Sequence, residues 1–340
     1  MTMRESIEPD MTPLGPIGPE GREGPEGPER EFTIKARTQG QMVRRRFIRH
    51  RGAAIGFTAL VIVIILAYTS IGFWKIPGWW YLGYTTTNPI VNGGAPTLDI
   101  IPGFLDGDGF DVGPHPFGQD QIGRDYFALT MRGTQISLMV AFVIGIMSTF
   151  IGAVAGAISG YYGGKADNVI MRFTDLLLTI PILTIAAVVG NAFGKLGPFF
   201  LAVVLSLLIW TSLARLVRGE FLSLREKEYV EAARAMGASS PRIIFRHMLP
   251  NAIGTIIVSA TLTIAVAILL EAALSFLGFG IQSPDTSLGL LISTYQTAFS
   301  TRPWLFWFPG LFIVIIALSV NFIGDGLRDA FDPKQTRVRA

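Results

Sequence analysis

Residues that commonly perform catalysis or bind metal are few in this sequence. The chain has no cysteine, which excludes disulfides, thiolate metal ligands and a cysteine nucleophile. Its three histidines are too far apart in sequence to suggest a histidine-based metal site. The run Gly190-x3-Gly194-Lys195-Leu196 is one residue too short for a P-loop and lacks the Ser or Thr that would hold Mg²⁺. We therefore expect this chain to bind no metal or cofactor and to hydrolyse no ATP.

The composition is that of a membrane protein. Of the 340 residues 50 % are hydrophobic and 16 % are charged, and the mean hydropathy is +0.47. Soluble domains carry about 25 % charged residues. Six apolar stretches are each long enough to cross a bilayer. Their expected ranges are 52–74, 134–160, 173–193, 199–216, 252–276 and 304–323.

The distribution of Lys and Arg orients these spans. A cluster of arginines between Arg44 and Arg51 precedes the first span, which places that side in the cytoplasm. With both ends inside, the basic residues left outside are Lys75, Arg124, Arg132, Lys195 and Arg302, out of 28 in all. We expect a multi-pass protein of the inner or plasma membrane with both termini cytoplasmic. We expect the arginine cluster to contact membrane lipid. Binding of nucleic acid is disfavoured because the cluster lies next to a membrane span.

The spans divide the chain into regions. Residues 1–43 are rich in Pro, Gly and Glu and are expected to form a disordered cytoplasmic tail. The other expected regions are a basic flank with the first transmembrane helix (44–74), an external loop (75–133), a core with five transmembrane helices (134–327), a cytoplasmic loop within that core (217–250) and a cytoplasmic tail (328–340).

The external loop begins with aromatic residues and continues with acidic ones. Trp74, Trp79, Trp80 and Tyr81 are typical of a belt at the membrane interface. The aspartates that follow are Asp99, Asp106, Asp108, Asp111, Asp120 and Asp125. They could suggest calcium, but the Asp106–Asp111 run lacks the downstream bidentate Glu of an EF-hand loop. A solvated loop is the favoured interpretation.

Three features stand out within the spans. Gly152, Gly156 and Gly160 recur every four residues and predict close approach of a neighbouring helix. Pro181 should kink the third span because a proline removes one helix hydrogen bond. Glu271 is an ionisable residue inside the fifth span and is therefore a candidate for the transport pathway. Alternatively, it reaches interfacial water near the outer end of that span.

Residues 223–251 are the longest run between two apolar spans that still looks firmly structured. Ser223 and Glu226 have the spacing of a capping box, which predicts a helix start. Strong helix formers follow, and Gly237 then stands where a helix end needs a left-handed residue. Ser240 and Pro241 predict the start of a second short helix that ends before residue 250.

Both short helices carry apolar side chains among basic ones. The apolar residues are Val230, Ala233, Met236, Ile243, Ile244, Phe245 and Met248. They would be exposed if nothing docked on them, so the pattern indicates a surface for a protein partner.

The spacing in this loop resembles the E-A-A-x3-G-x9-I-x-L-P loop of ABC-importer permeases. Its members here are Glu231, Ala232, Ala233, Gly237, His247, Leu249 and Pro250, with His247 at the isoleucine position. By this resemblance these residues, with Ser240, Pro241 and Arg246, form a pair of coupling helices seated on an ATPase.

Other segments resemble the dipeptide, oligopeptide and nickel group of these permeases. They start at residues 115 (HPFGQDQIGRDYFALTMRGTQISL), 160 (GYYGGKADNVIMRFTD), 274 (LSFLGFGIQSPDTSLG) and 321 (NFIGDGLRDAFDPK). In the first of them Gln119 and Gln135 replace the usual Thr and Arg. The resemblance covers roughly residues 115–335.

The resemblance implies an all-α membrane protein with six transmembrane helices in the type I ABC importer permease fold, as the C-type second permease. The implied partners are a second homologous permease, two ATP-binding cassette subunits that bind ATP and Mg²⁺, and an extracytoplasmic solute-binding protein. The implied function is a pathway for di- or oligopeptides.

Other functions remain open. The same machinery could import nickel or another small solute. A secondary transporter is more remote, because it would more often show inverted repeats and intramembrane charges. An intramembrane enzyme would need buried catalytic residues that the spans lack.

Overall fold

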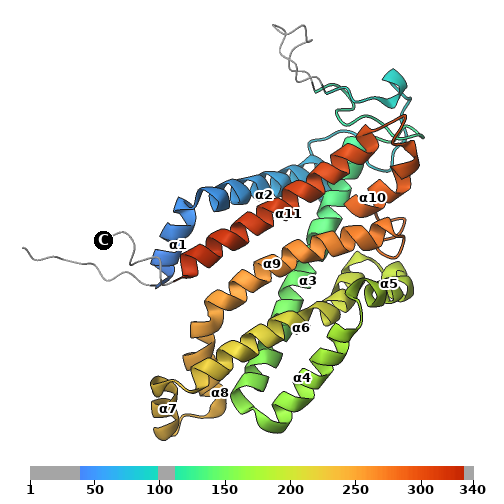
Figure 1. Ribbon diagram of the computed structural model, residues 1–340. Coiled ribbons are helices and arrows are strands. Elements are labelled where there is room, and N and C mark those ends of the chain that lie inside the picture. The colour runs from blue at the N-terminus through green and yellow to red at the C-terminus, as the bar shows by residue number, and fades with distance from the viewer. Residues whose placement is uncertain (1–38, 99–111, 333–340) are drawn as a thin grey trace, which may run out of the picture. The chain divides into compact units, whose positions relative to one another are not determined.

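Long helices dominate the computed structural model, which describes residues 39–98 and 112–332 (Figure 1). The helices are α1 (Gln39–Arg49), α2 (Arg51–Ser70), α3 (Tyr126–Tyr162), α4 (Gly164–Thr179), α5 (Ile182–Phe193), α6 (Pro198–Arg225), α7 (Glu228–Ala235), α8 (Ser240–Arg242), α9 (Leu249–Phe276), α10 (Leu288–Tyr295) and α11 (Trp304–Phe331). The shorter elements are strands β1 (Gly72–Phe73) and β2 (Ile76–Pro77), 3-10 turns η1 (Asn92–Gly94), η3 (Gly194–Leu196) and η5 (Gln296–Ala298), and the π-helical η4 (Ile243–Met248). Within these residues five helices are long and apolar enough to cross a membrane, or six if the bent pair α4–α5 is one span.

Helices α3 and α6 pack closely because glycines line the contact. A Cβ atom on Gly152 would lie 2.7 Å from the Trp210 carbonyl oxygen, and one on Gly156 would lie 2.5 Å from that of Ala214. At Gly160 it would lie 2.5 Å from the Phe221 Cβ. No side chain fits at these distances, so the predicted approach of a neighbouring helix is confirmed, and the neighbour is α6.

The remaining long helices pack on this pair. Helix α11 packs along α2 and α9, and α9 packs on α3, an arrangement visible in Figure 1. Ile144 of α3, Leu205 of α6, Ile268 of α9 and Ile316 of α11 are all buried in one apolar cluster. This cluster determines how the ends of the helices are positioned.

The third predicted span is two helices rather than one kinked helix. Helices α4 and α5 meet at an angle of 87°, with Ile180 and Pro181 between them in extended or non-helical conformation. The break is at the predicted proline, but α4 begins at Gly164, in the segment expected to be a cytoplasmic turn. The apolar pattern after residue 173 did not reveal this earlier start, because α4 carries charged residues in its first turns.

Several helix ends differ from the predicted boundaries. Helix α1 begins at Gln39, inside the tail expected to be disordered, and the Arg46 guanidinium donates to the Asp332 carbonyl oxygen at 3.1 Å. Helix α11 runs on to Phe331, past the predicted boundary at 327. Helix α3 begins at Tyr126, within the predicted external loop. The rest of the predicted tails, residues 1–38 and 333–340, lies outside the described residues.

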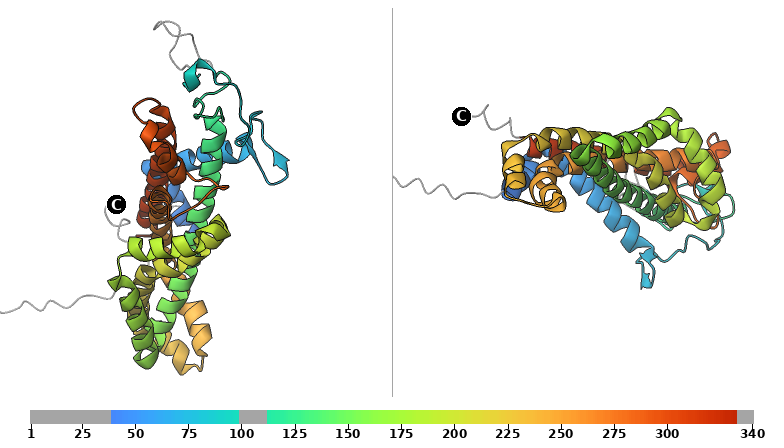
Figure 2. Two further views of the ribbon diagram at one scale, coloured as in Figure 1. Left: turned by 90° about the vertical axis from the view of Figure 1, so that its right-hand side faces the viewer. Right: turned by 90° about the horizontal axis from the view of Figure 1, so that it is seen from below.

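The region after α2 contains a short hairpin and a packed loop. The first predicted span ends at Ser70, and β1 and β2 then pair antiparallel. Figure 2 shows this hairpin projecting beyond the helices in both views, and Trp74 on it is 89 % exposed. Helix α10 was not predicted from the sequence. It packs against α9 and α11.

Candidate functional site

The turn at Gly237 has the predicted left-handed backbone, with φ of +80°. The Ala238 N–H donates to the Ala233 carbonyl oxygen at 3.0 Å, and the Gly237 N–H donates to that of Arg234 at 3.0 Å. This pair of bonds is the Schellman motif, which closes a helix end through a residue of positive φ. The predicted glycine C-cap of α7 is confirmed.

The predicted capping box at Ser223 and Glu226 is wrong. Helix α6 continues through Ser223 to Arg225, and α7 begins only at Glu228. The reason is tertiary, because Phe221 and Leu224 keep the apolar face of α6 buried beyond the membrane-length segment. A local capping signal does not end a helix whose next turn is still gaining buried area.

The second short helix does not end before Pro250. Residues from Ser240 to Phe276 run on as one helix through the π-helical η4, and Ser239 rather than Ser240 is the N-cap. The Leu249 N–H donates to the Ile244 carbonyl oxygen, five residues back. Pro250 then falls in the first turn of the α-helical register, a position at which proline is well tolerated.

Most of the apolar residues expected to be exposed are buried within the chain. Val230, Ala233, Ile243 and Met248 are each at most 2 % exposed and pack in one cluster with Phe221 of α6. Ile244 is buried in the same cluster. Only Met236 and Phe245 remain exposed, at 81 % and 66 %. The expected partner surface is therefore smaller, and the loop is held firmly on α6 and α9.

A polar hollow lies on the surface of this loop, at the end of the bundle where Figure 1 shows α7 and α8. It measures about 370 Å³, and its lining residues are Ala233, Met236, Gly237, Ala238, Arg242, Arg246 and His247. The Glu231 side chain is exposed, and its carboxylate has no hydrogen-bond or ion-pair partner among residues 39–98 and 112–332. We call Glu231, Met236, Arg242, Phe245 and Arg246 the loop surface. Of the other predicted site residues, Ala232, Pro241 and Pro250 are exposed, and Ser240, His247 and Leu249 are half-buried.

Glu271 does not border water, lipid or an open pathway in this chain. Its side chain is fully buried. One carboxylate oxygen accepts from the Ser137 hydroxyl of α3 and the other from the Ser275 hydroxyl, each at 2.7 Å. Full burial argues against the expected pathway role and against the alternative of interfacial water, and uptake by a Glu271 variant tests this interpretation. Ser275 lies four residues after Glu271 on α9 itself, but Ser137 comes from α3, and sequence spacing does not reveal that contact.

The sequence matches a known protein family over more than half of its length. Residues 148–337 match the family described as the inner membrane component of binding-protein-dependent transport systems. The chain belongs to this family. It is therefore a multi-pass permease component of a transport system, and its family is not a family of enzymes.

Curated relatives are similar to this chain along most of its length. The chain is 40 % identical over 299 residues to the oligopeptide transport system permease protein OppC of Mycobacterium bovis, a match that covers 88 % of this chain and 96 % of that protein. It is 35 % identical over 289 residues to OppC of Bacillus subtilis, covering 85 % and 88 %.

A solved structure shares the fold of the permease. An inward-facing structure of the MetNI methionine ABC transporter matches with a TM-score of 0.50 at 22 % identity, covering 60 % of this chain and 97 % of that chain. The expected ABC-importer permease fold is confirmed.

The permease also contains two buried polar groups that the sequence interpretation missed. Asp125 caps α3 by accepting from the Ala128 N–H at 2.8 Å, and it contacts the His115 Nδ1 at 2.8 Å and the Trp80 Nε1 at 3.0 Å. Its carboxyl group is fully buried, and this burial raises its pKa, although the His115, Ala128 and Trp80 hydrogen bonds oppose the rise. Trp80 is thus tied to α3 and is not a free member of an interfacial belt.

Asp120 is the second buried acid. Its carboxylate binds the Arg124 Nε at 2.7 Å and accepts from the Tyr295 hydroxyl at 2.8 Å. Burial is the first cause that raises the pKa of Tyr295, and the Asp120 charge adds to it. The interpretation of these aspartates as solvated is therefore wrong for Asp120 and Asp125. The other four lie outside the described residues.

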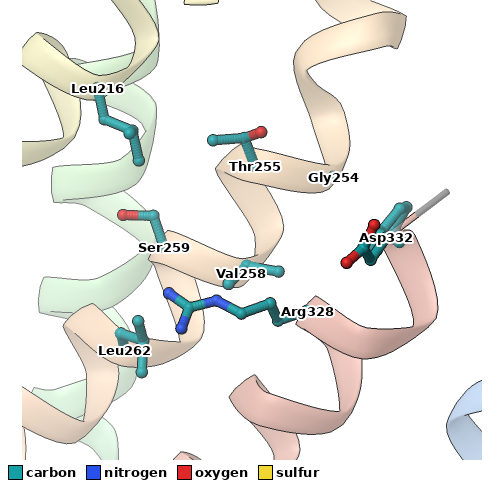
Figure 3. Close-up of a pocket in the computed structure, with 9 residues that line it drawn as sticks. Leu216, Gly254, Thr255, Val258, Ser259, Leu262, Arg328 and Asp332 are labelled. Atoms are coloured by element: carbon teal, nitrogen blue, oxygen red, sulfur yellow. The ribbon is translucent and has the colours of Figure 1, made fainter. Parts of the chain in front are cut away.

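A groove between α6, α9 and α11 was also missed, because its residues are far apart in sequence. It measures about 380 Å³. Figure 3 shows the Arg328 side chain of α11 extending toward α9, with Thr255 and Ser259 above it.

No group of three or more metal-ligating side chains occurs in the part of the chain that the structure describes.

Proposed function

We propose that this permease is one of two homologous subunits that enclose the pathway of an ATP-driven peptide importer. The observation that carries the proposal is the loop surface, since it projects an unpaired carboxylate and two arginines beside exposed Met236 and Phe245. Such a mixed surface fits a groove on a protein partner. Support for peptide as the solute comes from the relatives named as oligopeptide permeases.

The loop surface is the contact for one of two ATPase subunits. These partners bind ATP and Mg²⁺, and this chain supplies no nucleotide site. Val230, Ile243 and Met248 join the loop to α6 and α9 through a buried cluster. A displacement of the loop by the ATPase would therefore move both helices together. Nucleotide binding would then bias the assembly between two arrangements of its helices.

The orientation follows from charge. The loop surface, α1 and the end of α11 lie on the cytoplasmic side, where Lys and Arg are concentrated. The hairpin and the Asp120 and Asp125 groups lie on the outer side and face the solute-binding protein.

The test is a complex reconstituted in liposomes from both permeases, the two ATPases and the binding protein. ATP-dependent uptake of labelled trialanine is measured, with nickel ion as a parallel solute. We expect peptide uptake that requires ATP, the ATPases and the binding protein. Uptake of nickel with no uptake of any peptide would overturn peptide as the solute.

A further inference from the structure

The groove between α6, α9 and α11 contains hydrogen-bond donors that the fold does not use (Figure 3). Within residues 39–98 and 112–332, no ion pair or hydrogen bond joins the Arg328 guanidinium to another group. The Thr255 and Ser259 hydroxyls of α9 line the same groove and likewise make no hydrogen bond in this part of the chain. Three side chains with unused donors therefore line one space.

These donors stand near one surface of the membrane. About 36 Å of helix separate Trp304, at the start of α11, from Arg328, which is more than the roughly 30 Å of a hydrocarbon core. Arg328 is therefore at the depth of the lipid headgroups, in the leaflet on the side of the loop surface. A basic pocket between helices at this depth is typical of a site for a lipid headgroup.

The rest of the groove is apolar. Its apolar lining residues are Leu216 of α6, Val258 and Leu262 of α9, and Phe331 of α11. Leu262 lies about 10 Å further along α9 than Thr255, toward the middle of the membrane. Leu216 is 45 % exposed, so the groove is open at the surface of the helices. A polar end at headgroup depth and an apolar wall below it match the two parts of a phospholipid.

An acidic residue at the rim does not neutralise Arg328. Asp332 also lines the groove, but Figure 3 shows the Arg328 side chain extending away from it. The Arg46 guanidinium of α1 lies beside Asp332 and donates to its carbonyl oxygen at 3.1 Å. A cation other than Arg328 thus balances the Asp332 charge. Arg328 remains available for an anion, and guanidinium binds phosphate through charge-assisted hydrogen bonds.

We propose that this groove binds a phospholipid, with the lipid phosphate on Arg328 and an acyl chain along Val258 and Leu262. The Thr255 and Ser259 hydroxyls donate to the remaining phosphate oxygens. A free phosphate ion would use only the polar end of the groove. The apolar wall therefore favours a lipid as the source of the phosphate.

The first experiment measures binding of phosphatidylglycerol, a lipid whose phosphate carries its only charge. The complete transporter is purified in detergent, and bound lipid is counted by native mass spectrometry. Arg328→Ala should lower the affinity for one phosphatidylglycerol about tenfold, the worth of one charge-assisted hydrogen bond. Arg328→Lys should keep most of the binding. Arg172→Ala, at an exposed arginine of α4 outside the groove, should leave binding unchanged.

Two competitors distinguish the lipid from its headgroup. Inorganic phosphate and deacylated glycerophosphoglycerol both carry the phosphate without acyl chains. Neither should displace phosphatidylglycerol when added at the same concentration. If either one displaces it as well as unlabelled phosphatidylglycerol does, the groove is a site for free phosphate groups, and a lipid as the occupant is rejected.

The position of the lipid is tested in the wild type, so this experiment needs no variant to fold. Phosphatidylglycerol with a photoreactive diazirine on its acyl chain is cross-linked to the complete transporter, and the modified residues are mapped. We expect modification of Leu216, Val258 or Leu262. Modification only elsewhere would overturn the proposal, since the second permease would then cover the groove. Wild-type affinity of Arg328→Ala would also overturn it, and neither result bears on peptide import.

Discussion

The Ser137 hydroxyl donates to the Glu271 carboxylate at 2.7 Å and joins α3 to α9 inside the membrane-spanning bundle. The same hydroxyl accepts from the Leu288 N–H of α10 at 3.2 Å, and Ser275 accepts from the Ile281 N–H at 3.1 Å. Glu271 is thus the centre of a satisfied polar network that connects three helices. From this network we infer a structural role for Glu271, in place of the transport role expected for a charge in a span.

Replacing Glu271 with Leu should lower the stability of the permease. The two serine hydroxyls would lose their buried acceptor, at a cost of about 1–3 kcal/mol for each unsatisfied group. We expect less assembled complex and a lower melting temperature in detergent, with normal uptake per assembled complex. Ser293→Ala, at an exposed hydroxyl, is the control. Full assembly with slow uptake would instead point to the pathway.

Replacing Gly237 with Leu should uncouple the loop surface while the chain still inserts in the membrane. The φ of +80° is unfavourable for a side chain by roughly 1 kcal/mol or more, so the angle between α7 and α8 should change. In the reconstituted complex, uptake should fall, and ATP hydrolysis should be lost or no longer respond to loaded binding protein. Gly219→Ala is the matched control, since Gly219 lies in α6 with open space around it and no positive φ.

Glu231→Lys should give the same phenotype through charge. Glu231 has no partner within the part of the chain that the structure describes, so we expect its partner on the ATPase. Uptake and stimulated hydrolysis are measured together, with Glu231→Gln as an intermediate case. Normal values for both Glu231→Lys and Gly237→Leu would show that this loop does not couple the subunits.

Replacing Gly156 with Ala should disrupt the packing of α3 on α6. The added Cβ would lie 2.5 Å from the Ala214 carbonyl oxygen, and one such overpacked contact costs typically 1–3 kcal/mol. We expect a lower melting temperature and a smaller yield of folded protein. Gly310→Ala on α11, where no atom lies within 4 Å, should have no such effect. Equal behaviour of the two variants would contradict the role of the stripe.

Asp125 should make stability depend on pH. Burial raises its pKa in the folded state, so the folded chain binds this proton more tightly than the unfolded one. The stabilising contribution is fully present below the ordinary value of 3.8 and is lost as pH rises through the raised pKa. Thermal unfolding of wild type and Asp125→Asn is compared across this range. The Asp125→Asn variant should lack this part of the pH dependence. If its melting temperature varies with pH as that of the wild type does, Asp125 is not the group responsible.

The loop surface and the hairpin should be accessible from opposite sides of the membrane. The chain has no cysteine, so single cysteines report cleanly. In cells that make the permease without its ATPases, an impermeant maleimide should label Met236→Cys only in inside-out vesicles and Trp74→Cys only in intact cells, since both positions are highly exposed in the chain alone. Labelling of Met236→Cys from outside intact cells would reject the proposed orientation.

The sequence by itself determined the features that depend on short-range chemistry. The apolar stretches predicted the long helices because their length matches a bilayer, and Pro181 predicted a kink, because it lacks an N–H, at the place where the chain has a full break. Gly237 predicted a left-handed turn because only glycine adopts that backbone at little cost. The spaced motifs indicated the family because each is a local pattern that can be recognised without knowing which helices contact one another.

Tertiary structure decided every feature that needs a partner distant in sequence. Ser223 was misread as a helix start because Phe221 and Leu224 continue to bury the apolar face of α6. Glu271 and Asp125 looked solvent-facing or functional until Ser137 and Trp80 were placed beside them. The free energy of a buried charge depends on the donors around it, and packing alone brings those donors together.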